Sequence, residues 1–367
     1  MDNLFYEIAL SKVMNVGPIT AKILISYCGS AEAVFKEKKH RLEKIPNIGV
    51  LTLDQINIDL VSKDTERELE FIRKRNIEVL YFLNTNYPSR LKHYSESPII
   101  LYYLGSTDLN HPRTIAVVGT RDISEYGKSV TQNLISALSQ SDVVVISGLA
   151  YGVDSMAHKS CISENIPTIG VLGHGLDKIY PAENSKLAEK MILNGGLLTQ
   201  FGIGTKPDRE NFPLRNRIVA GISDAVVVIE TKKKGGSIIT AELANEYNKD
   251  VFAFPGRITD ENSLGCNELI KTNKAMLIES ANDIINIMQW TNDKSELRSK
   301  FTPELFIELN DEENMIVEKL NRNDKKHIDL LHNQLNFTPG ILASNLLTLE
   351  FKGVIKELPG KYYLLNN

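Results

Sequence analysis

The fold is decided by residues 114–150, TIAVVGTRDISEYGKSVTQNLISALSQSDVVVISGLA. Two apolar runs, at 114–120 and 142–150, flank an amphipathic segment over residues 125–140. Continuous Val and Ile runs bounded by glycine are typical of strands that are buried on both faces, and the segment between them has the length and pattern of a helix. The stretch therefore predicts two neighbouring parallel strands that are joined by a helix.

The same alternation continues to about residue 290. Further apolar runs are PTIGVLG (167–173), GLLTQF (196–201), DAVVVIET (224–231), DVFAFPG (250–256) and KAMLIES (274–280). Amphipathic helical patterns lie between most of these runs. Residues 113–290 are therefore expected to form one doubly wound α/β domain, with a mostly parallel sheet that helices cover on both faces.

Composition limits the function classes. The chain has 367 residues, of which 42% are hydrophobic and 24% charged, so two or three domains are expected. It has neither a long uncharged apolar run nor a basic-then-apolar leader, so we expect a cytoplasmic protein without a membrane partner. The three cysteines form no CxxC pair, and neither a disulfide framework nor a metal site is expected. Because the net charge is −4, a polyanion would need a local basic cluster.

The loops after the expected strands hold unusual residues. Gly119 and Arg121 follow the first strand, Gly148 follows the second, and KKKGGSIIT (232–240) follows the fifth. Ligands of doubly wound sheets bind beyond the carboxyl ends of the strands, where glycine allows close backbone approach and helix N-termini attract anions. The pattern predicts a phosphate-binding rim. The alternative is that these glycines serve turn geometry alone.

Nucleotide cofactors do not fit this rim. A dinucleotide fingerprint requires GxGxxG, whereas GTRDIS after the first strand has one glycine followed by an arginine. The GGSIITAE segment lacks the GK[ST] of an NTPase loop, so no lysine is placed for a β- or γ-phosphate. NAD, FAD and ATP are disfavoured, and no cofactor is expected.

A basic stretch, GIGTKPDRENFPLRNR (202–217), stands out in this acidic chain. It holds four basic and two acidic side chains, a local charge of 4 − 2 = +2. Guanidinium groups bind phosphates bidentately, Asn216 can hydrogen-bond a base edge, and Phe212 can stack an unpaired base for about 1–3 kcal/mol. The alternative is a solvated basic turn in which Phe212 fills the core.

Six motifs occur in an order and spacing that resemble the DNA-processing protein A family (DprA, also called Smf). They are VVGTR, SGLAYGVDSMAH, GHGLDKIYP, NFPLRNRIVAGISD, KKGGSIITAELA and PGRI followed by GCNELIK, between residue 113 and about residue 275. The resemblance implies a Rossmann-like domain that binds single-stranded DNA without catalysis. It also implies protection of incoming strands and loading of the RecA recombinase during natural transformation, by a protein that forms a homodimer.

The resemblance also implies a set of site residues. The family's arginine after the first strand falls on Arg121, its RNR motif on residues 215–217, and its glycine-serine turn on Gly236 and Ser237. His174 departs from the family, since many relatives carry a small or hydroxyl residue there. No catalytic or metal-binding residue is expected. The expected DNA-binding residues are Gly119, Arg121, Gly148, Lys178, Lys206, Phe212, Arg215, Asn216, Arg217, Gly236, Ser237 and Thr240.

Four regions are expected along the chain. Residues 1–65 form a helical domain, in which KVMNVGPITAKILISY and LEKIPNIGVLTLDQI indicate either helix-hairpin-helix units or an ordinary small bundle. Residues 66–290 form the Rossmann-like domain, with its core over 113–290. A charged linker over 291–312 follows, and residues 313–367 are expected to form a winged-helix-like domain.

The expected winged-helix-like domain has its own signals. Thr338 and Pro339 begin the last of three expected helices, and a β-hairpin is expected to turn at Pro359-Gly360. The segment PGILASNLLTLEF (339–351) contains no lysine or arginine. Because a recognition helix without cations is a poor reader of phosphate, we expect this domain to contact protein rather than DNA.

An enzymatic function is the alternative. GGSIITAE, with Glu242 at its end, is faintly similar to the PGGxGTxxE loop of nucleoside-monophosphate phosphoribohydrolases. There a carboxylate assists cleavage of the N-glycosidic bond. Glu242 is also placed as an ordinary surface carboxylate on a helix, and the two interpretations stay open at this point.

Overall fold

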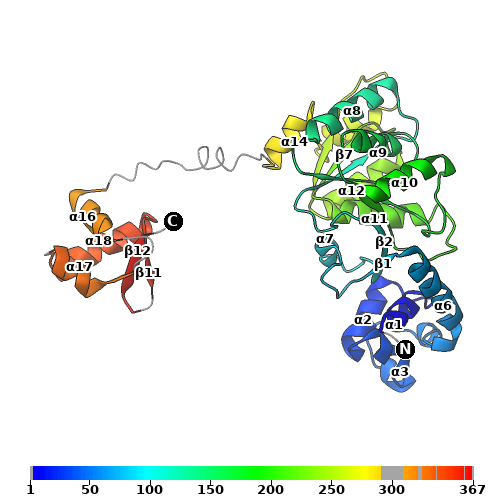
Figure 1. The fold of residues 1–367 in the computed structure, drawn as a ribbon, viewed down its shortest axis with the longest axis horizontal. Helices are drawn as coiled ribbons and strands as arrows, with labels where there is room; N and C mark the ends of the chain where they lie inside the picture. Colours follow the sequence, from blue (N-terminus) through cyan, green and yellow to red (C-terminus); the bar gives the residue numbers. More distant parts are fainter. Residues whose placement is uncertain (1–2, 291–308, 321–324, 336, 359, 366–367) are drawn as a thin grey trace. The chain divides into compact units, whose positions relative to one another are not determined.

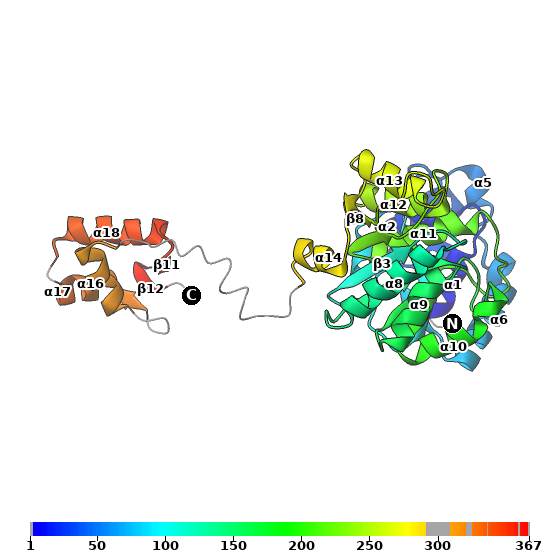
Figure 2. The ribbon, with the colours of Figure 1, turned by 90° about the horizontal axis from the view of Figure 1, so that it is seen from above.

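The computed structural model describes residues 3–290, 309–320, 325–335, 337–358 and 360–365. The chain forms two compact units, residues 1–292 and residues 293–367 (Figures 1 and 2). The linker expected over 291–312 lies outside the described residues as far as position 308. None of the helices in the described ranges combines the length and apolar character that crossing a bilayer requires.

A nine-stranded sheet organises the first unit, in the order β1-β2-β6-β5-β4-β3-β7-β8-β9. All seven runs predicted as strands are strands, and they pair in parallel from β6 to β9. The sheet also has β2, antiparallel to both of its neighbours, and β1 at the edge. The doubly wound, mostly parallel sheet is thereby confirmed. The strands are β1 (Glu78–Tyr81), β2 (Ile100–Gly105), β3 (Thr114–Val118), β4 (Val144–Ser147), β5 (Thr168–Val171), β6 (Gly195–Thr199), β7 (Ala225–Val228), β8 (Asp250–Ala253) and β9 (Met276–Leu277).

Successive residues of each central strand enter different cores, because side chains alternate across a sheet. In β3, Ala116 and Val118 pack with α7, α11, α12 and α13, whereas Ile115 and Val117 pack with α8, α9 and α14. Helix α10 packs mainly on β6 and α9. Figures 1 and 2 show these two helical layers on either side of the sheet. The helices are α7 (Ser89–Lys92), α8 (Glu125–Leu138), α9 (Val153–Ser163), α10 (Ser185–Leu193), α11 (Asn211–Ile222), α12 (Gly236–Glu246), α13 (Leu264–Lys271) and α14 (Ala281–Ile287), with a 3-10 turn, η1, at Ala182–Asn184.

The N-terminal helices share a core with the edge of the sheet. Residues of β1 and β2 pack in the same apolar cluster as these helices, and α6 runs through the boundary expected at residue 65. Helix α6 continues because Val61, Leu69 and Ile72 form its buried face, and it ends at Asn76 in the left-handed conformation. The helices are α1 (Asn3–Ser11), α2 (Pro18–Cys28), α3 (Ala31–Lys36), α4 (Lys39–Leu42), α5 (Val50–Leu53) and α6 (Ile58–Arg75).

A buried histidine in α9 makes the stability of the sheet domain sensitive to acid. The hydroxyl of Thr168 donates to the Val145 carbonyl, so Nδ1–H of His158 donates to Thr168 Oγ1 at 2.7 Å. Its Nε2 is buried without a hydrogen-bond partner among the described residues. Burial, with a smaller contribution from nearby Arg215, lowers the pKa of His158 to about 3. The folded state therefore holds the neutral imidazole.

We expect this histidine to contribute acid sensitivity below about pH 6.5. Below that pH the imidazole is protonated in the unfolded chain but stays neutral in the folded chain. The free energy of unfolding therefore falls by up to about 1.4 kcal/mol per pH unit, until the pH approaches the folded pKa of about 3. Urea unfolding at pH 7.5, 6.0 and 5.0 measures this slope. In His158→Gln the slope should be smaller, and equal slopes in both proteins would contradict the assignment.

The second unit is a small winged-helix domain. Three helices pack on a three-stranded antiparallel sheet of order β10-β12-β11, and their apolar residues form a separate core. The Thr338 side chain accepts from the Ile341 amide and Pro339 begins α18, as expected. Of the expected turn, Gly360 is described and Pro359 lies outside the described residues. The elements are α16 (Asp311–Lys319), β10 (Lys326–His327), α17 (Ile328–Leu335), α18 (Pro339–Phe351), β11 (Ile355–Leu358) and β12 (Tyr362–Leu365).

Candidate functional site

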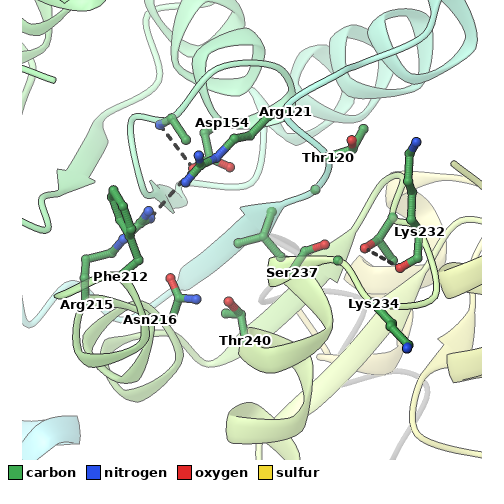
Figure 3. Close-up of a pocket in the computed structure, with 16 residues that line it drawn as sticks. Thr120, Arg121, Asp154, Phe212, Arg215, Asn216, Lys232, Lys234, Ser237 and Thr240 are labelled. Atoms are coloured by element: carbon green, nitrogen blue, oxygen red, sulfur yellow. Dashed lines mark hydrogen bonds and ion pairs between the residues drawn. The ribbon is translucent and has the colours of Figure 1, made fainter. Parts of the chain in front are cut away.

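A pocket of about 330 Å³ opens at the carboxyl edge of the sheet, beyond β3 and β7. The chain order reverses between these adjacent strands, and this is where doubly wound sheets bind ligands. We call it the first pocket; Figure 3 shows its walls. Its lining residues are Val118, Gly119, Thr120, Arg121, Ala150, Asp154, Phe212, Arg215, Asn216, Thr231, Lys232, Lys234, Gly235, Gly236, Ser237 and Thr240.

The deepest cation of the first pocket is Arg215, only 6% exposed. Its Nη1 lies 3.7 Å from Oδ2 of Asp154, which also accepts from the amides of Gly148 and Ala150. That separation allows ionic attraction but exceeds a good hydrogen bond, and the Nε of Arg215 is buried with no partner among the described residues. The guanidinium therefore retains hydrogen-bonding capacity for an additional acceptor.

The electrostatics of this pair favour an incoming anion. Burial lowers the pKa of Arg215, although Asp154 opposes that shift, and the nearby positive charge of Arg121 adds to it. Burial likewise raises the pKa of Asp154, against the opposing effect of Arg215. The positive charge of Arg121 disfavours the charged form of Arg215, so a phosphate bound beside both arginines would stabilise the Arg215 guanidinium.

An aromatic ring lies close to both of these arginines. The guanidinium carbon of Arg121 is 5.2 Å from the centre of the Phe212 ring, and that of Arg215 is 6.0 Å away. The backbone of Gly173 borders the same ring, since a Cβ there would lie 3.2 Å from Phe212 Cδ1. Phe212 is half-buried and lines the pocket, so part of its ring is available to stack a planar group.

The opposite wall is the amino end of α12. Its N-cap, Gly235, has no side chain to bond the amides of the first turn. The Ile238 amide donates to the Gly235 carbonyl at 3.1 Å, and the amides of Gly236 and Ser237 are left for a ligand. The hydroxyl of Ser237 is buried and has no hydrogen-bond partner among the described residues. Thr240 lies one turn later on the same wall. An unpartnered hydroxyl beside an uncapped helix end fits a phosphate oxygen.

Two lysines complete the pocket, and the sequence reasoning did not select them. Lys232 and Lys234 line the wall across from Arg121 and Arg215 (Figure 3). Lys232 pairs with exposed Glu261 at 2.6 Å, whereas Lys234 makes no hydrogen bond or ion pair with a described residue. The run KKK at 232–234 was the sequence feature that could have pointed to these lysines. The conformation of the loop, which the sequence does not give, decides which of the three line the pocket.

The structure brings most of the expected site residues together. Gly148 adjoins the first pocket at a smaller hollow that Arg121, Phe212 and Arg215 also line. A Cβ on Gly148 would lie 1.1 Å from Nη1 of Arg215, so only glycine leaves room for the guanidinium. The expected residues that line the first pocket itself are Gly119, Arg121, Phe212, Arg215, Asn216, Gly236, Ser237 and Thr240.

Arg217 lies elsewhere. Residues two apart on a helix point about 200° away from each other, so Arg217 and Arg215 lie on opposite sides of α11. Arg217 lines a different cavity, with Tyr94 and Tyr247. The two arginines of the RNR motif therefore do not meet at one point.

Several other expected residues lie outside these walls. Lys178 pairs with Asp177 at 3.7 Å, and Lys206 is exposed in the loop before α11; neither lines the first pocket or the smaller hollow. Glu242, the carboxylate of the enzymatic alternative, pairs with Lys274 at 2.8 Å and is not among the described residues of the first pocket. The ion pair with Lys274 holds the Glu242 carboxylate on the flank of α12, outside the first pocket.

His174 has a structural place beside the site. It is 1% exposed, its Nδ1–H donates to the Gly175 carbonyl, and its Nε2 accepts from the Tyr180 amide at 3.2 Å. These bonds shape the loop that borders the smaller hollow. The local pocket shape here is therefore set by an imidazole that joins the two ends of this loop.

Comparison with known proteins identifies the family. The family model described as DNA recombination-mediator protein A matches residues 78–289, and the model described as DprA winged helix domain matches residues 303–361. The chain is 37% identical over 284 residues to the protein Smf of Synechocystis sp., with 76% of this chain and 71% of that protein covered.

Two solved structures share the fold. The DNA processing protein A of Streptococcus pneumoniae is 31% identical with a TM-score of 0.68, and the match covers 78% of this chain and 98% of that one. The Helicobacter pylori protein, whose structure is described in terms of a single-stranded DNA binding mode, is 32% identical with a TM-score of 0.53, covering 58% and 95%. The chain described here therefore belongs to the DNA recombination-mediator protein A family, whose members are named DprA or Smf.

Proposed function

We propose that this protein binds single-stranded DNA in the first pocket as a recombination mediator and not as an enzyme. One observation carries the proposal: the incompletely paired guanidinium of Arg215 lies beside an accessible aromatic ring and opposite an uncapped helix end. Cations and free amides suit phosphates, and the ring suits an unpaired base. The structure of the Helicobacter pylori relative supports this ligand class.

The site favours a strand of any sequence. Its described walls offer cations, amides and a ring face, which every nucleotide engages, and Asn216 is the amide side chain placed for a base edge. A base in a duplex is stacked on its neighbours and cannot lie on Phe212. Binding should therefore prefer single strands and weaken with added salt, because bound phosphates release counterions.

Fluorescence anisotropy tests this proposal. A labelled dT oligonucleotide and the corresponding duplex are titrated with the full chain at 50, 100 and 200 mM salt. Preference for the single strand, with log affinity falling linearly against log salt, supports the proposal. Failure to bind at the lowest salt would overturn it, and release of free base from nucleoside monophosphates by the same preparation would favour the enzymatic alternative.

Lys234 and Lys233 provide a matched pair. Both are exposed neighbours on one loop, but only Lys234 is among the residues that line the first pocket. Lys234→Ala is expected to lower oligonucleotide affinity by about three- to tenfold and to reduce the salt slope by about one phosphate contact. Lys233→Ala removes the same charge next to the pocket. Equal losses in the two variants would show that the loop acts only through its net charge.

The finer roles are proposals of the same kind. We propose that the protein coats incoming strands in the cytoplasm during natural transformation and loads RecA onto them. A homodimer would increase avidity by linking two sites on one strand. RecA ATP hydrolysis on DNA already covered by a single-strand-binding protein should start sooner when this protein is added. An unchanged lag would contradict loading, and a monomer mass in sedimentation at micromolar concentration would contradict the dimer.

A further inference from the structure

A second pocket, of about 360 Å³, lies on the other side of α11, where the N-terminal helices meet the sheet domain. This volume is within the range of roughly 300–1,000 Å³ that is typical of ligand pockets. Its walls come from α2, the loop after α7, α11 and the end of α12. Its lining residues are Gly17, Pro18, Ile19, Thr20, Leu91, Tyr94, Glu96, Ser97, Pro98, Gln200, Leu214, Arg217, Ile218 and Tyr247.

Two tyrosines form a fixed aromatic wall in the second pocket. The rings of Tyr94 and Tyr247 stack with their centres 3.9 Å apart and their planes at 23°. The Tyr94 hydroxyl donates to the Tyr247 carbonyl, and the Tyr247 hydroxyl donates to Glu96 at 2.8 Å. These bonds orient both rings before any ligand arrives, which lowers the entropy lost on binding.

The loop that carries Tyr94 is also tied to α2. The ammonium of Lys22 donates to the carbonyls of Tyr94 and Ser95 and to the hydroxyl of Ser97, at 2.8–3.0 Å. The first residues of α2 and this loop are two of the walls of the second pocket. The cavity is therefore built from elements that are bonded to one another, and it is present without a ligand.

Arg217 supplies a positive charge in the second pocket. Its side chain is exposed, makes no hydrogen bond or ion pair with a described residue, and interacts electrostatically with Glu96 across the pocket. All five of its N–H donors are therefore available to a ligand. A free guanidinium beside stacked aromatic rings and proline matches a nucleotide unit, in which a phosphate is joined to a planar base.

The second pocket and the first share two helices in their walls. Helix α11 lines both, and α12 runs from Ser237 in the first pocket to Tyr247, its C-cap, in the second. Ten residues of helix span about 15 Å, which equals about four or five nucleotides at the 3.4 Å spacing of a helical strand and fewer in an extended strand. Leu214, which lines the second pocket on α11, is 37% exposed.

We propose that the second pocket is a further subsite for the same single strand, in which Arg217 binds a phosphate and the Tyr94–Tyr247 wall contacts a base. The proposal rests on the function proposed for the first pocket. It gives the RNR motif two separate roles, one arginine to each side of α11. It also gives the first glycine turn, at residues 17–20, a place against the DNA strand.

Oligonucleotide length separates the two subsites. A 2-mer of dT is too short to span both pockets, whereas a 12-mer reaches both. The wild-type chain is expected to gain at least about tenfold in affinity from the 2-mer to the 12-mer, because the second contact becomes intramolecular. In Arg217→Glu that gain should fall below about threefold. Lys186→Glu, which reverses an exposed charge on α10 outside both pockets, should keep the wild-type gain.

Photocrosslinking locates the bases. The 12-mer is made with 5-bromodeoxyuridine at each position in turn, irradiated with the full chain and mapped by mass spectrometry. Adducts on Tyr94 or Tyr247 at positions at least about three nucleotides from those that label Phe212 support the subsite. Adducts on Phe212 alone, with an unchanged length gain in Arg217→Glu, overturn the subsite and leave the first pocket standing. Absence of wild-type binding at every length overturns both.

Discussion

Replacing Arg215 with methionine is expected to lower affinity for single-stranded DNA by about 100-fold and to destabilise the fold. The guanidinium lies in the first pocket beside Phe212 and is the partner of buried Asp154. Its loss removes charge-assisted bonds to phosphate, worth about 1.5–3 kcal/mol each. It also leaves a carboxylate buried without a counter-charge, which costs about 3–5 kcal/mol. Anisotropy and urea unfolding measure the two effects.

A second substitution separates binding from stability. In Arg215→Met with Asp154→Asn, the amide oxygen still accepts from Gly148 and Ala150, and the unpaired charge is gone. The free energy of unfolding should therefore recover most of its loss, while DNA affinity stays about 100-fold low. If the double variant bound DNA as wild type does, Arg215 would be a structural residue only, and the first pocket would lose its main phosphate ligand.

Gly148→Ala is expected to lower DNA affinity by about 10- to 100-fold through Arg215. The added Cβ would lie 1.1 Å from Nη1 of that arginine and 2.2 Å from Cζ. The guanidinium must leave its place against Phe212 and Asp154, since the backbone of β4 at Ser147 is fixed in the centre of the sheet. Anisotropy with a dT oligonucleotide measures the loss, which corresponds to about 1.4–2.8 kcal/mol.

A double variant tests whether the loss of DNA affinity in Gly148→Ala is caused by displacement of Arg215. Once Arg215→Met has removed the guanidinium, Gly148→Ala should cost less than about threefold more. Gly340→Ala, at a glycine whose added Cβ meets nothing within 4 Å, is the matched control and should bind as wild type does. Equal losses from Gly148→Ala in both backgrounds would mean that the methyl group blocks the strand directly.

The fold could be predicted from the sequence because its strands are buried on both faces. Such strands read as uninterrupted apolar runs, and all seven runs between residues 114 and 280 are strands. Parallel strands also end at one edge, so Gly119, Arg121 and Ser237 were predictable neighbours. The strands β1 and β2 escaped prediction, because they precede the alternation of strands and helices that begins at residue 113, and one face of each packs with the N-terminal helices.

The site was predicted less completely, for two different reasons. Helical periodicity alone separates Arg215 from Arg217, so a sequence argument that applied it would have split the RNR motif. Lys232 and Lys234 could not be selected in the same way. They lie on a loop, where no regular repeat relates position in the chain to direction in space.

The sequence by itself determined the doubly wound sheet, the winged helix domain and the edge of the sheet at which the first pocket lies. Only the tertiary structure decided which charges are buried together and which rings meet. Asp154 and Arg215 come from different helices, and the hydroxyl of Tyr94 bonds the carbonyl of Tyr247, 153 residues away. Such contacts depend on how helices pack across the sheet, and local propensity and periodicity carry no information on that packing.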